Sequence, residues 1–515
     1  MPERPIPPPP PTLPVGDVSP QSAARRRDLK LGGRTLREHT ARGSLINGAF
    51  LSGVGLLALG KGFLLAGFLS REDYGIWGVL AVTFWSLLWL KQVGIGDKYI
   101  QQDEDDQELA FQKAFTLEAI LNLAFLVLLA AALPVMALVY GERDLILPGL
   151  VLLAILPAGA LQWPVVAYHR RMQFVRQRSL MAFEPVVGFV VSVGLAIAGA
   201  GYWALVLGAL AGAWAASVAA LVVSPYPMRL RYERGTMRSY ASFSGPLFLA
   251  TLGSLLIAQG GILTSDAYLG LAGVGAVTLA ATISQFTDRV DGAVTGALYP
   301  AICAVRDRVD LLQESFVKSN RLALMWAMPF GLGLTLFADD LVSFGIGEEW
   351  RPAVVLLQAY GVTAAIAHVG FNWDAYHRAI GKTWPIAVAS GAAAIVFLAS
   401  VLPLLRAYEL KGFAIAVGLQ ALAHVIVRAY FLRRLFQGFG FVLHALRAMA
   451  PTVPAVLAVL AARALETGER TLLMAFGELS LFLAVATAAT AALEGPLLRE
   501  AVAYLRARPS ASAPV

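Results

Sequence analysis

Four polar residues recur at helical spacing in an otherwise apolar part of the sequence. Intervals of four, three and four residues separate Ser284, Asp288, Asp291 and Thr295. On a helix, this spacing places all of them on one face. A carboxylate inside an apolar helix can take up and release protons, so we predict an ion-coupling role for Asp288 and Asp291. The alternative is that either carboxylate only neutralises Arg289, which flanks this face. Arg289 itself is a candidate cation for an anionic ligand.

Basic residues also occur deep inside apolar stretches, at Lys61, Lys91 and Arg428. A charge at membrane depth costs at least about 2.5–3.5 kcal/mol and persists mainly where it faces a cavity or a partner. We therefore predict that these cations bind substrate in a cavity. The alternatives are a structural ion pair for Lys61 and an ordinary boundary residue for Arg428. His424 shares a helix face with Arg428 and is either a proton-binding group or a hydrogen-bonded packing residue.

Several kinds of chemistry are excluded by what the sequence lacks. Cys303 is the only cysteine, which rules out an internal disulfide and the usual zinc or iron–sulfur sites. The phosphate-binding pattern GxxxxGK[ST] does not occur, so we expect no ATP hydrolysis. The longest loop on the expected outer side, 339–350, is short and acidic, which disfavours a membrane polymerase or ligase. We expect no catalytic residue, no metal and no cofactor.

Composition identifies the elements that must hold these residues. Of the 515 residues, 57% are hydrophobic and only 15% are charged, and the mean hydropathy is +0.66. A soluble domain carries about 25% charged residues, so this chain lacks the charge to cover its helices with polar faces. An all-α polytopic membrane protein is the expected fold class. The net charge of +7 would also fit nucleic acid, but excess arginine in a membrane protein usually reflects orientation, and we expect no such partner.

Apolar stretches long enough to cross about 30 Å of hydrocarbon follow one another from Ser44 onward. We predict fourteen spans, at 44–69, 74–95, 114–139, 145–168, 183–200, 202–224, 243–265, 270–300, 317–338, 351–375, 384–404, 411–432, 441–462 and 470–492. The average of 32 residues for a span and its loop leaves no room for a folded extramembrane domain.

The predicted spans divide the chain into six parts. Residues 1–43 are rich in proline and arginine and predict a disordered tail, with no cleavable signal peptide. An N-terminal lobe is predicted at 44–224, followed by a cytoplasmic linker at 225–242 and a C-terminal lobe at 243–435. A terminal helix pair at 441–492 and a second cytoplasmic tail at 493–515 complete the chain.

Basic residues give the orientation of these spans. Of the 41 Lys and Arg residues, 30 fall in segments on the side of the N-terminus and only 7 in the alternate loops. The positive-inside rule therefore predicts that both termini are cytoplasmic. The basic loops on that side would also contact anionic lipid headgroups.

A weak internal repeat relates the two halves of the chain. The segment 69–82 aligns with 269–282 at an offset of 200 residues, which also makes Asp291 the counterpart of Lys91. Two six-helix halves of the same direction around a central cavity are a transporter architecture that permits alternating access.

Six segments then make the chain resemble a known family. They are LSREDYGIWGVLAV (69–82), VGIGDKYIQ (93–101), YHRRMQFVRQRSLMAFEP (168–185), GAGYWALVLGALAG (199–212), LYPAI (298–302) and GEEWRPAVVLLQAYG (347–361). With these, the chain resembles the bacterial polysaccharide transporters, the O-antigen and exopolysaccharide flippases of the multidrug/oligosaccharidyl-lipid/polysaccharide exporter superfamily. The resemblance covers about residues 44–435.

The resemblance implies transport and no bond chemistry. Members of this family move polyprenyl-pyrophosphate-linked oligosaccharides across the bacterial inner membrane, with two six-helix lobes facing a central cavity. It implies a monomeric flippase for O-antigen, capsule or exopolysaccharide synthesis that works beside polymerase or export machinery. A drug/cation exporter or a lipid II flippase of the same superfamily is the alternative.

Overall fold

The structure is a computed structural model that describes residues 29–31, 33–140, 145–284, 288–466 and 468–506. Within these ranges every regular element is helical. The chain is therefore an all-α protein in the part described, as composition predicts.

The first half of the chain forms one group of helices, which we call the first lobe. Its members are α2 (Leu36–Ala66), α3 (Arg71–Trp89), α4 (Ile95–Gln101), α5 (Gln107–Tyr140), α6 (Ile146–Leu152), α7 (Ile155–Leu161), α8 (Pro164–Arg170), α9 (Phe174–Ile197) and α10 (Trp203–Val222). Capping boxes start two of these helices, because Thr35 pairs with Glu38 before α2 and Ser70 pairs with Asp73 before α3.

The second half forms the second lobe and three terminal helices. The second lobe contains α11 (Arg234–Ser284), α12 (Asp288–Ala304), α13 (Val309–Leu336), α14 (Ala338–Asp340), η3 (Leu341–Ile346), η4 (Glu348–Ala353), α15 (Val354–Ala367), α16 (Trp373–Ala379) and α17 (Trp384–Leu435). The terminal helices are α18 (Phe441–Met449), α19 (Val453–Leu465) and α20 (Leu472–Arg506).

Two of these helices are too long to cross a membrane once. At 1.5 Å per residue, the 52 residues of α17 would extend for about 78 Å. The backbone of α17 reverses at Glu409, whose φ of 51° and ψ of −132° are not helical. Packing shows a reversal in the region of α11 as well, because Leu247 shares a buried cluster with Tyr299 whereas Ile257 packs with Ala276.

Length and composition identify eight helices of the described chain that can span a membrane, or ten if each bent pair counts as one span. This number counts α17 as one span, although its backbone reverses at Glu409. The chain is thus a multi-pass membrane protein, and the number fourteen stays a prediction.

Several helices depart from the predicted boundaries, and α20 continues to Arg506 although its span was predicted to end at 492. Helix α2 begins at Leu36, so residues 36–43 extend the first span and do not belong to the tail as we predicted. The span predicted at 351–375 is interrupted, because α15 ends at Ala367 and α16 begins at Trp373. The span predicted at 441–462 bends by 48° between α18 and α19, next to Pro451, which cannot donate a helical hydrogen bond.

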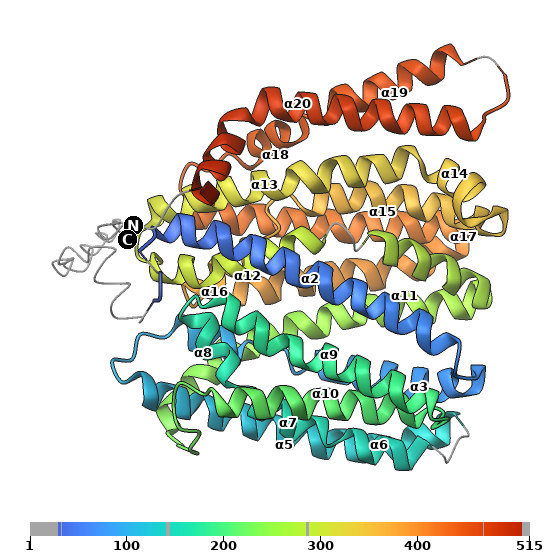
Figure 1. The fold of residues 1–515 in the computed structure, drawn as a ribbon. Coiled ribbons are helices and arrows are strands. Elements are labelled where there is room, and N and C mark those ends of the chain that lie inside the picture. Colours follow the sequence, from blue (N-terminus) through green and yellow to red (C-terminus); the bar gives the residue numbers. More distant parts are fainter. Residues whose placement is uncertain (1–28, 32, 141–144, 285–287, 467, 507–515) are drawn as a thin grey trace, which may run out of the picture.

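The two lobes lie side by side, with α2 between them (Figure 1). Helix α2 packs on α9 of its own lobe, where a Cβ on Gly43 would overlap with the Phe174 ring. It also packs on α12 of the second lobe, where a Cβ on Gly48 would lie 3.9 Å from that of Ala293. Helix α2 is thus the element that joins the lobes.

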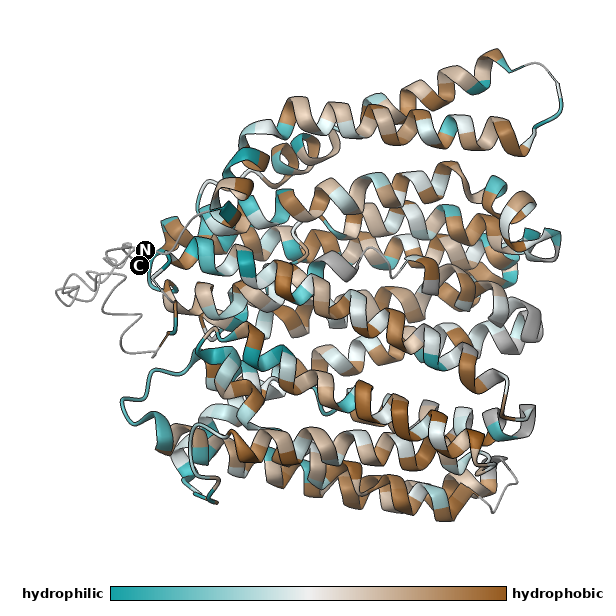
Figure 2. Ribbon diagram, viewed as in Figure 1, coloured by the Kyte–Doolittle hydropathy of each residue, from teal (hydrophilic) through white to brown (hydrophobic). Residues whose placement is uncertain are grey.

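The start of α2 and the end of α20 lie at the same end of the bundle (Figure 1), where Arg42 donates to the carbonyl of Leu505 at 3.0 Å. We call this the basic end, since it also holds Arg306 and Lys318. Hydrophilic residues gather there, and the middle of the bundle is mostly apolar (Figure 2). This distribution follows the charge asymmetry that the sequence predicts.

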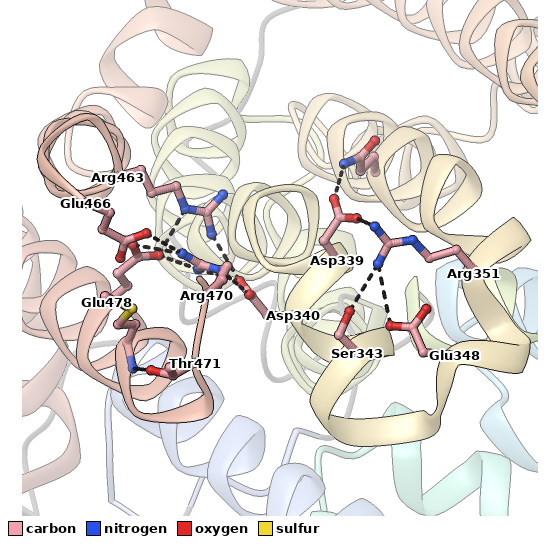
Figure 3. Close-up of polar contacts among 12 residues, drawn as sticks. Asp339, Asp340, Ser343, Glu348, Arg351, Arg463, Glu466, Arg470, Thr471 and Glu478 are labelled. Carbon is pink, nitrogen blue, oxygen red and sulfur yellow. Dashed lines mark hydrogen bonds and ion pairs between the residues drawn. The ribbon is translucent and has the colours of Figure 1, made fainter. Parts of the chain in front are cut away.

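Charged pairs fasten the terminal helices to the second lobe at both ends. Figure 3 shows the cluster at the end opposite the basic end, where Arg463 and Arg470 from the α19–α20 corner meet Asp340 and Glu478. Arg470 lies 2.7 Å from both carboxylates, and these are 8% and 4% exposed. Near the basic end Arg321 pairs with the buried Glu494.

Candidate functional site

A cavity of about 290 Å³ lies between the two lobes. The first lobe contributes residues from the end of α3 and from α4, and the second lobe contributes residues from α11, α16 and α17. Its polar and aromatic lining consists of Trp89, Gln92, Asp97, Thr251, Ser254, Phe371, Trp373, Asp374, Arg378, Ser390, His424 and Arg428. We call it the central cavity.

A second cavity of about 190 Å³ adjoins the central cavity inside the second lobe. The two share His424 and Arg428 in their walls. Further polar lining comes from Ser284, Thr363, His368 and Gln420. Two of the residues selected from sequence, His424 and Arg428, therefore lie at the junction of both cavities.

Arg428 is 5% exposed and binds the backbone at the break between α15 and α16. Its Nη1 donates to the carbonyls of Ala367 and, at 3.0 Å, Val369. These carbonyls are free for this bond because the helix ends there, and a cation at a helix C-terminus is also favoured by the helix dipole. Nε of Arg428 is buried and has no hydrogen-bond partner in the described structure.

His424 lies one turn before Arg428 on α17 and is partly exposed to the cavities. Its ring makes an edge contact with Trp373, at 6.4 Å between centroids. Among the described residues neither ring nitrogen of His424 has a hydrogen-bond partner. The geometry therefore differs from the alternative of a hydrogen-bonded packing histidine.

The two lysines selected from sequence differ in their surroundings. Nζ of Lys91 lies 2.7 Å from Oε1 of Glu118 and donates to Asn122 at 2.9 Å, so Lys91 has a structural ion pair within the first lobe. Lys61, on α2, is half-buried and makes no hydrogen bond or ion pair within the described part of the chain. The ion pair that we considered for Lys61 is thus seen at Lys91.

The polar face of the helix α12 is described only in part. Oγ1 of Thr295 donates to Oδ1 of Asp291 at 2.7 Å. The side chains of Asp288 and Arg289 lie outside the described part of the structure, so their predicted roles stay predictions.

A charged group that sequence reasoning did not select joins the lobes at the cavity. Arg378 of α16 lies 2.7 Å from Asp97 of α4 and 3.0 Å from Asp374. Burial opposes the charge of Arg378, but these two carboxylates outweigh it and raise the pKa of the guanidinium. The hydroxyl of Tyr299 donates to the carbonyl of Asp97 at 3.0 Å.

More contacts between the lobes lie in the half of the bundle nearer the basic end. We call this group, together with the Asp97–Arg378 pair, the lobe latch. Its other members are the contacts of Arg306 with Gln101 and Asp103, of His169 with Gly296, and of Asn47 with Ala293.

The match to a family model decides what kind of protein this is. Residues 64–355, more than half of the chain, match the model described as polysaccharide biosynthesis protein. The chain belongs to this family. The match includes α3 to η4 in full and thus most of both lobes.

Two relatives are similar to this chain over more than 60% of its length. The succinoglycan biosynthesis transport protein ExoT of Rhizobium meliloti (strain 1021) is 23% identical over 324 residues, which are 62% of this chain and 65% of ExoT. The lipopolysaccharide biosynthesis protein WzxC of Escherichia coli (strain K12) is 23% identical over 351 residues, 65% of this chain and 69% of WzxC. The matched regions thus leave about a third of each relative uncovered.

Solved structures show that this chain has the fold of MATE transporters. A mutant of a MATE transporter superposes with a TM-score of 0.67 at 15% identity, over 81% of this chain and 96% of that one. A MOP superfamily transporter from Pyrococcus furiosus gives 0.63 at 14% identity, over 84% and 96%. At these identities the likeness establishes the fold alone.

Two of the segments that carry the family resemblance meet at the lobe latch. Asp97 lies in the VGIGDKYIQ segment and Tyr299 in LYPAI, and these two residues share the hydrogen bond between the lobes. These two family segments were therefore the feature of the sequence that pointed to this site. The spacing of polar residues within single helices could not reveal it.

Proposed function

We propose that this protein is a flippase that moves polyprenyl-pyrophosphate-linked oligosaccharide repeat units across the bacterial inner membrane by alternating access. The family and the names of ExoT and WzxC support a transporter in polysaccharide biosynthesis. On this proposal the protein is no enzyme, and it acts as a monomer that delivers repeat units to a polymerase or export machinery.

The central cavity is the single observation that carries the proposal. It lies between the lobes, and its walls offer a cation at Arg428 together with the indole rings of Trp89 and Trp373. A guanidinium matches the geometry of phosphate oxygens, and aromatic rings provide a flat apolar surface for a sugar. We propose that Arg428 in this wall attracts the pyrophosphate together with Lys61 of α2, which lies outside the lining. We further propose that His424 in the wall and Asp291 outside it take up the coupling ion.

The lobe latch supports a cycle in which one end of the cavity closes while the other opens. Its contacts join the lobes near the basic end, which charge asymmetry predicts to be cytoplasmic. A substrate from the cytoplasmic leaflet can enter only if these contacts break. We propose that Asp97–Arg378 forms in the outward-open state and separates in the inward-open state.

The test is made on a strain that lacks this gene. Polyprenyl-pyrophosphate-linked glycans are extracted and analysed by mass spectrometry, and surface polysaccharide is measured in the same cells. We expect a complete, unpolymerised repeat unit to accumulate while the surface polysaccharide disappears. Normal surface polysaccharide without accumulation would contradict the proposal, and drug susceptibility and lipid II export would then be measured for the alternative transporters.

A further inference from the structure

A third cavity, of about 510 Å³, lies at the basic end and shares no lining residue with the other two. It is enclosed by the start of α2, the segment before it and the turn that joins α8 to α9. Four cations line it, at Lys30, Arg34, Arg42 and Arg176, and no carboxylate of the described residues belongs to its lining. We call it the basic pocket. The described lining thus gathers several positive charges in one place.

The walls of the basic pocket are fixed by contacts between distant segments. The amide of Lys30 donates to the carbonyl of Arg171 at 3.0 Å, which ties the segment before α2 to the α8–α9 turn. Met172 in this turn has a φ of 58°, and its carbonyl lies 2.7 Å from Nε2 of His39. On the other side the Phe174 ring packs directly on Gly43. The pocket is therefore built in advance and does not depend on a ligand to assemble it.

One cation of the pocket has an unused donor. Nε of Arg34 is buried and has no hydrogen-bond partner among the described residues. A buried donor without an acceptor is unfavourable, and such groups in native proteins usually have a ligand, an ion or a water as partner. A phosphate oxygen is a strong acceptor for a guanidinium, and several neighbouring cations would share its charge.

The rim of the pocket is apolar and indicates which anion fits. Val175 and Ile46 belong to the lining, and the side chain of Val175 is 63% exposed. Beside them on α2, Leu45 is 59% exposed, as expected for a surface that faces lipid chains. A soluble anion gains nothing from such a rim, whereas a lipid can place its phosphate among the cations and its chain against the apolar residues.

We propose that the basic pocket binds the phosphate headgroup of a lipid from the leaflet at the basic end. The site is separate from the central cavity, and the proposal does not depend on the transported substrate. Two lipids share this chemistry, an anionic phospholipid and the polyprenyl-pyrophosphate carrier, and the experiment distinguishes them.

The test measures lipid binding to the purified full-length protein by native mass spectrometry after delipidation. Phosphatidylglycerol, phosphatidylcholine, polyprenyl pyrophosphate and inorganic pyrophosphate are titrated separately. The variant Arg34→Gln/Arg176→Gln removes two charges from the pocket. The matched control, Arg229→Gln/Arg238→Gln, removes two exposed charges elsewhere on the predicted cytoplasmic side.

We expect phosphatidylglycerol to bind more tightly than phosphatidylcholine, and the pocket variant to weaken this binding by about thirtyfold, since each basic residue near an anionic headgroup contributes about 1 kcal/mol. The control should bind as the unchanged protein does. Arg34→Lys/Arg176→Lys keeps the charge and should restore most of the binding, which separates lost charge from misfolding.

Competition then identifies the lipid. Displacement of phosphatidylglycerol by equimolar polyprenyl pyrophosphate would assign the pocket to the carrier, and retention of phosphatidylglycerol would assign it to the phospholipid. Equal loss in the control variant, or binding of inorganic pyrophosphate as tight as that of the lipids, would overturn the proposal.

Discussion

At the scale of single residues, Arg428 connects a broken helix to the central cavity. Its guanidinium satisfies the carbonyls of Ala367 and Val369, which an uninterrupted helix would have bonded internally. The same side chain lines both cavities of the second lobe. A single substitution at Arg428 therefore affects the stability of the break and the charge of the cavity together.

Replacement of Arg428 should separate these two effects. We expect Arg428→Gln to abolish export and to lower the free energy of unfolding by about 1–3 kcal/mol, because buried carbonyls lose their donor. Arg428→Lys should keep the cavity charge and recover part of the export. Thermal unfolding in detergent and surface polysaccharide in cells are measured together, with Arg433→Gln, an exposed residue of the same helix, as the control. Full export by Arg428→Gln would refute a substrate role.

The two lysines of the first lobe provide a matched comparison. Lys61 has no partner in the described structure, so we expect Lys61→Ala to abolish export while the protein inserts and melts normally. Lys91→Ala should instead lower the melting temperature, because it leaves Glu118 (15% exposed) without its cation. Export assays and melting curves on both variants test this. Normal export by Lys61→Ala would remove Lys61 from the proposed site.

Residue spacing predicted part of the candidate site and missed the rest for a physical reason. His424 and Arg428 were found because both lie on one face of one helix, where a period of four is visible. Asp97 and Arg378 are 281 residues apart and lie near the ends of spans, where charged residues are common. Only the packing of the two lobes brings them together.

At the scale of elements, the interruption between α15 and α16 could not be predicted from composition. The region 351–375 is apolar throughout most of its length and predicts one continuous span. The interruption is stabilised by Arg428 from α17, a distant part of the sequence. Non-helical backbone at membrane depth is tolerated where protein groups or a cavity satisfy it, and here both are present.

The terminal helices offer a test of how charged pairs hold an element. Glu478 is 4% exposed and accepts hydrogen bonds from Arg463 and Arg470. We expect Glu478→Gln to destabilise the protein by about 2–3 kcal/mol, since it leaves two partly buried cations with one carboxylate fewer. Thermal unfolding shows the change, with the exposed Glu469→Gln as control. Equal melting temperatures of the two variants would mean that the cluster contributes nothing to stability.

At the scale of the whole molecule, the lobe latch is the set of contacts that the proposed transport cycle has to break and form again. Contacts between the lobes gather in the half nearer the basic end, and the central cavity lies beside them. Composition and hydropathy were sufficient to predict a polytopic helical protein. They could not predict which faces meet, because apolar helix surfaces pack through shape and small residues and leave no periodic signal.

A disulfide between the lobes tests whether the latch must open during transport. The Cβ positions of residues 48 and 293 lie 3.9 Å apart across the α2–α12 contact, within the range that a disulfide requires. In the variant Gly48→Cys/Ala293→Cys, oxidation should therefore lock the lobes together, stop export and leave the protein folded. Addition of a reductant should restore export, because the contact can then separate again.

Each single-cysteine variant controls for Cys303, which is fully buried. If the oxidised Gly48→Cys/Ala293→Cys protein exports normally, the lobes do not separate at α2, and alternating access would have to proceed through another contact.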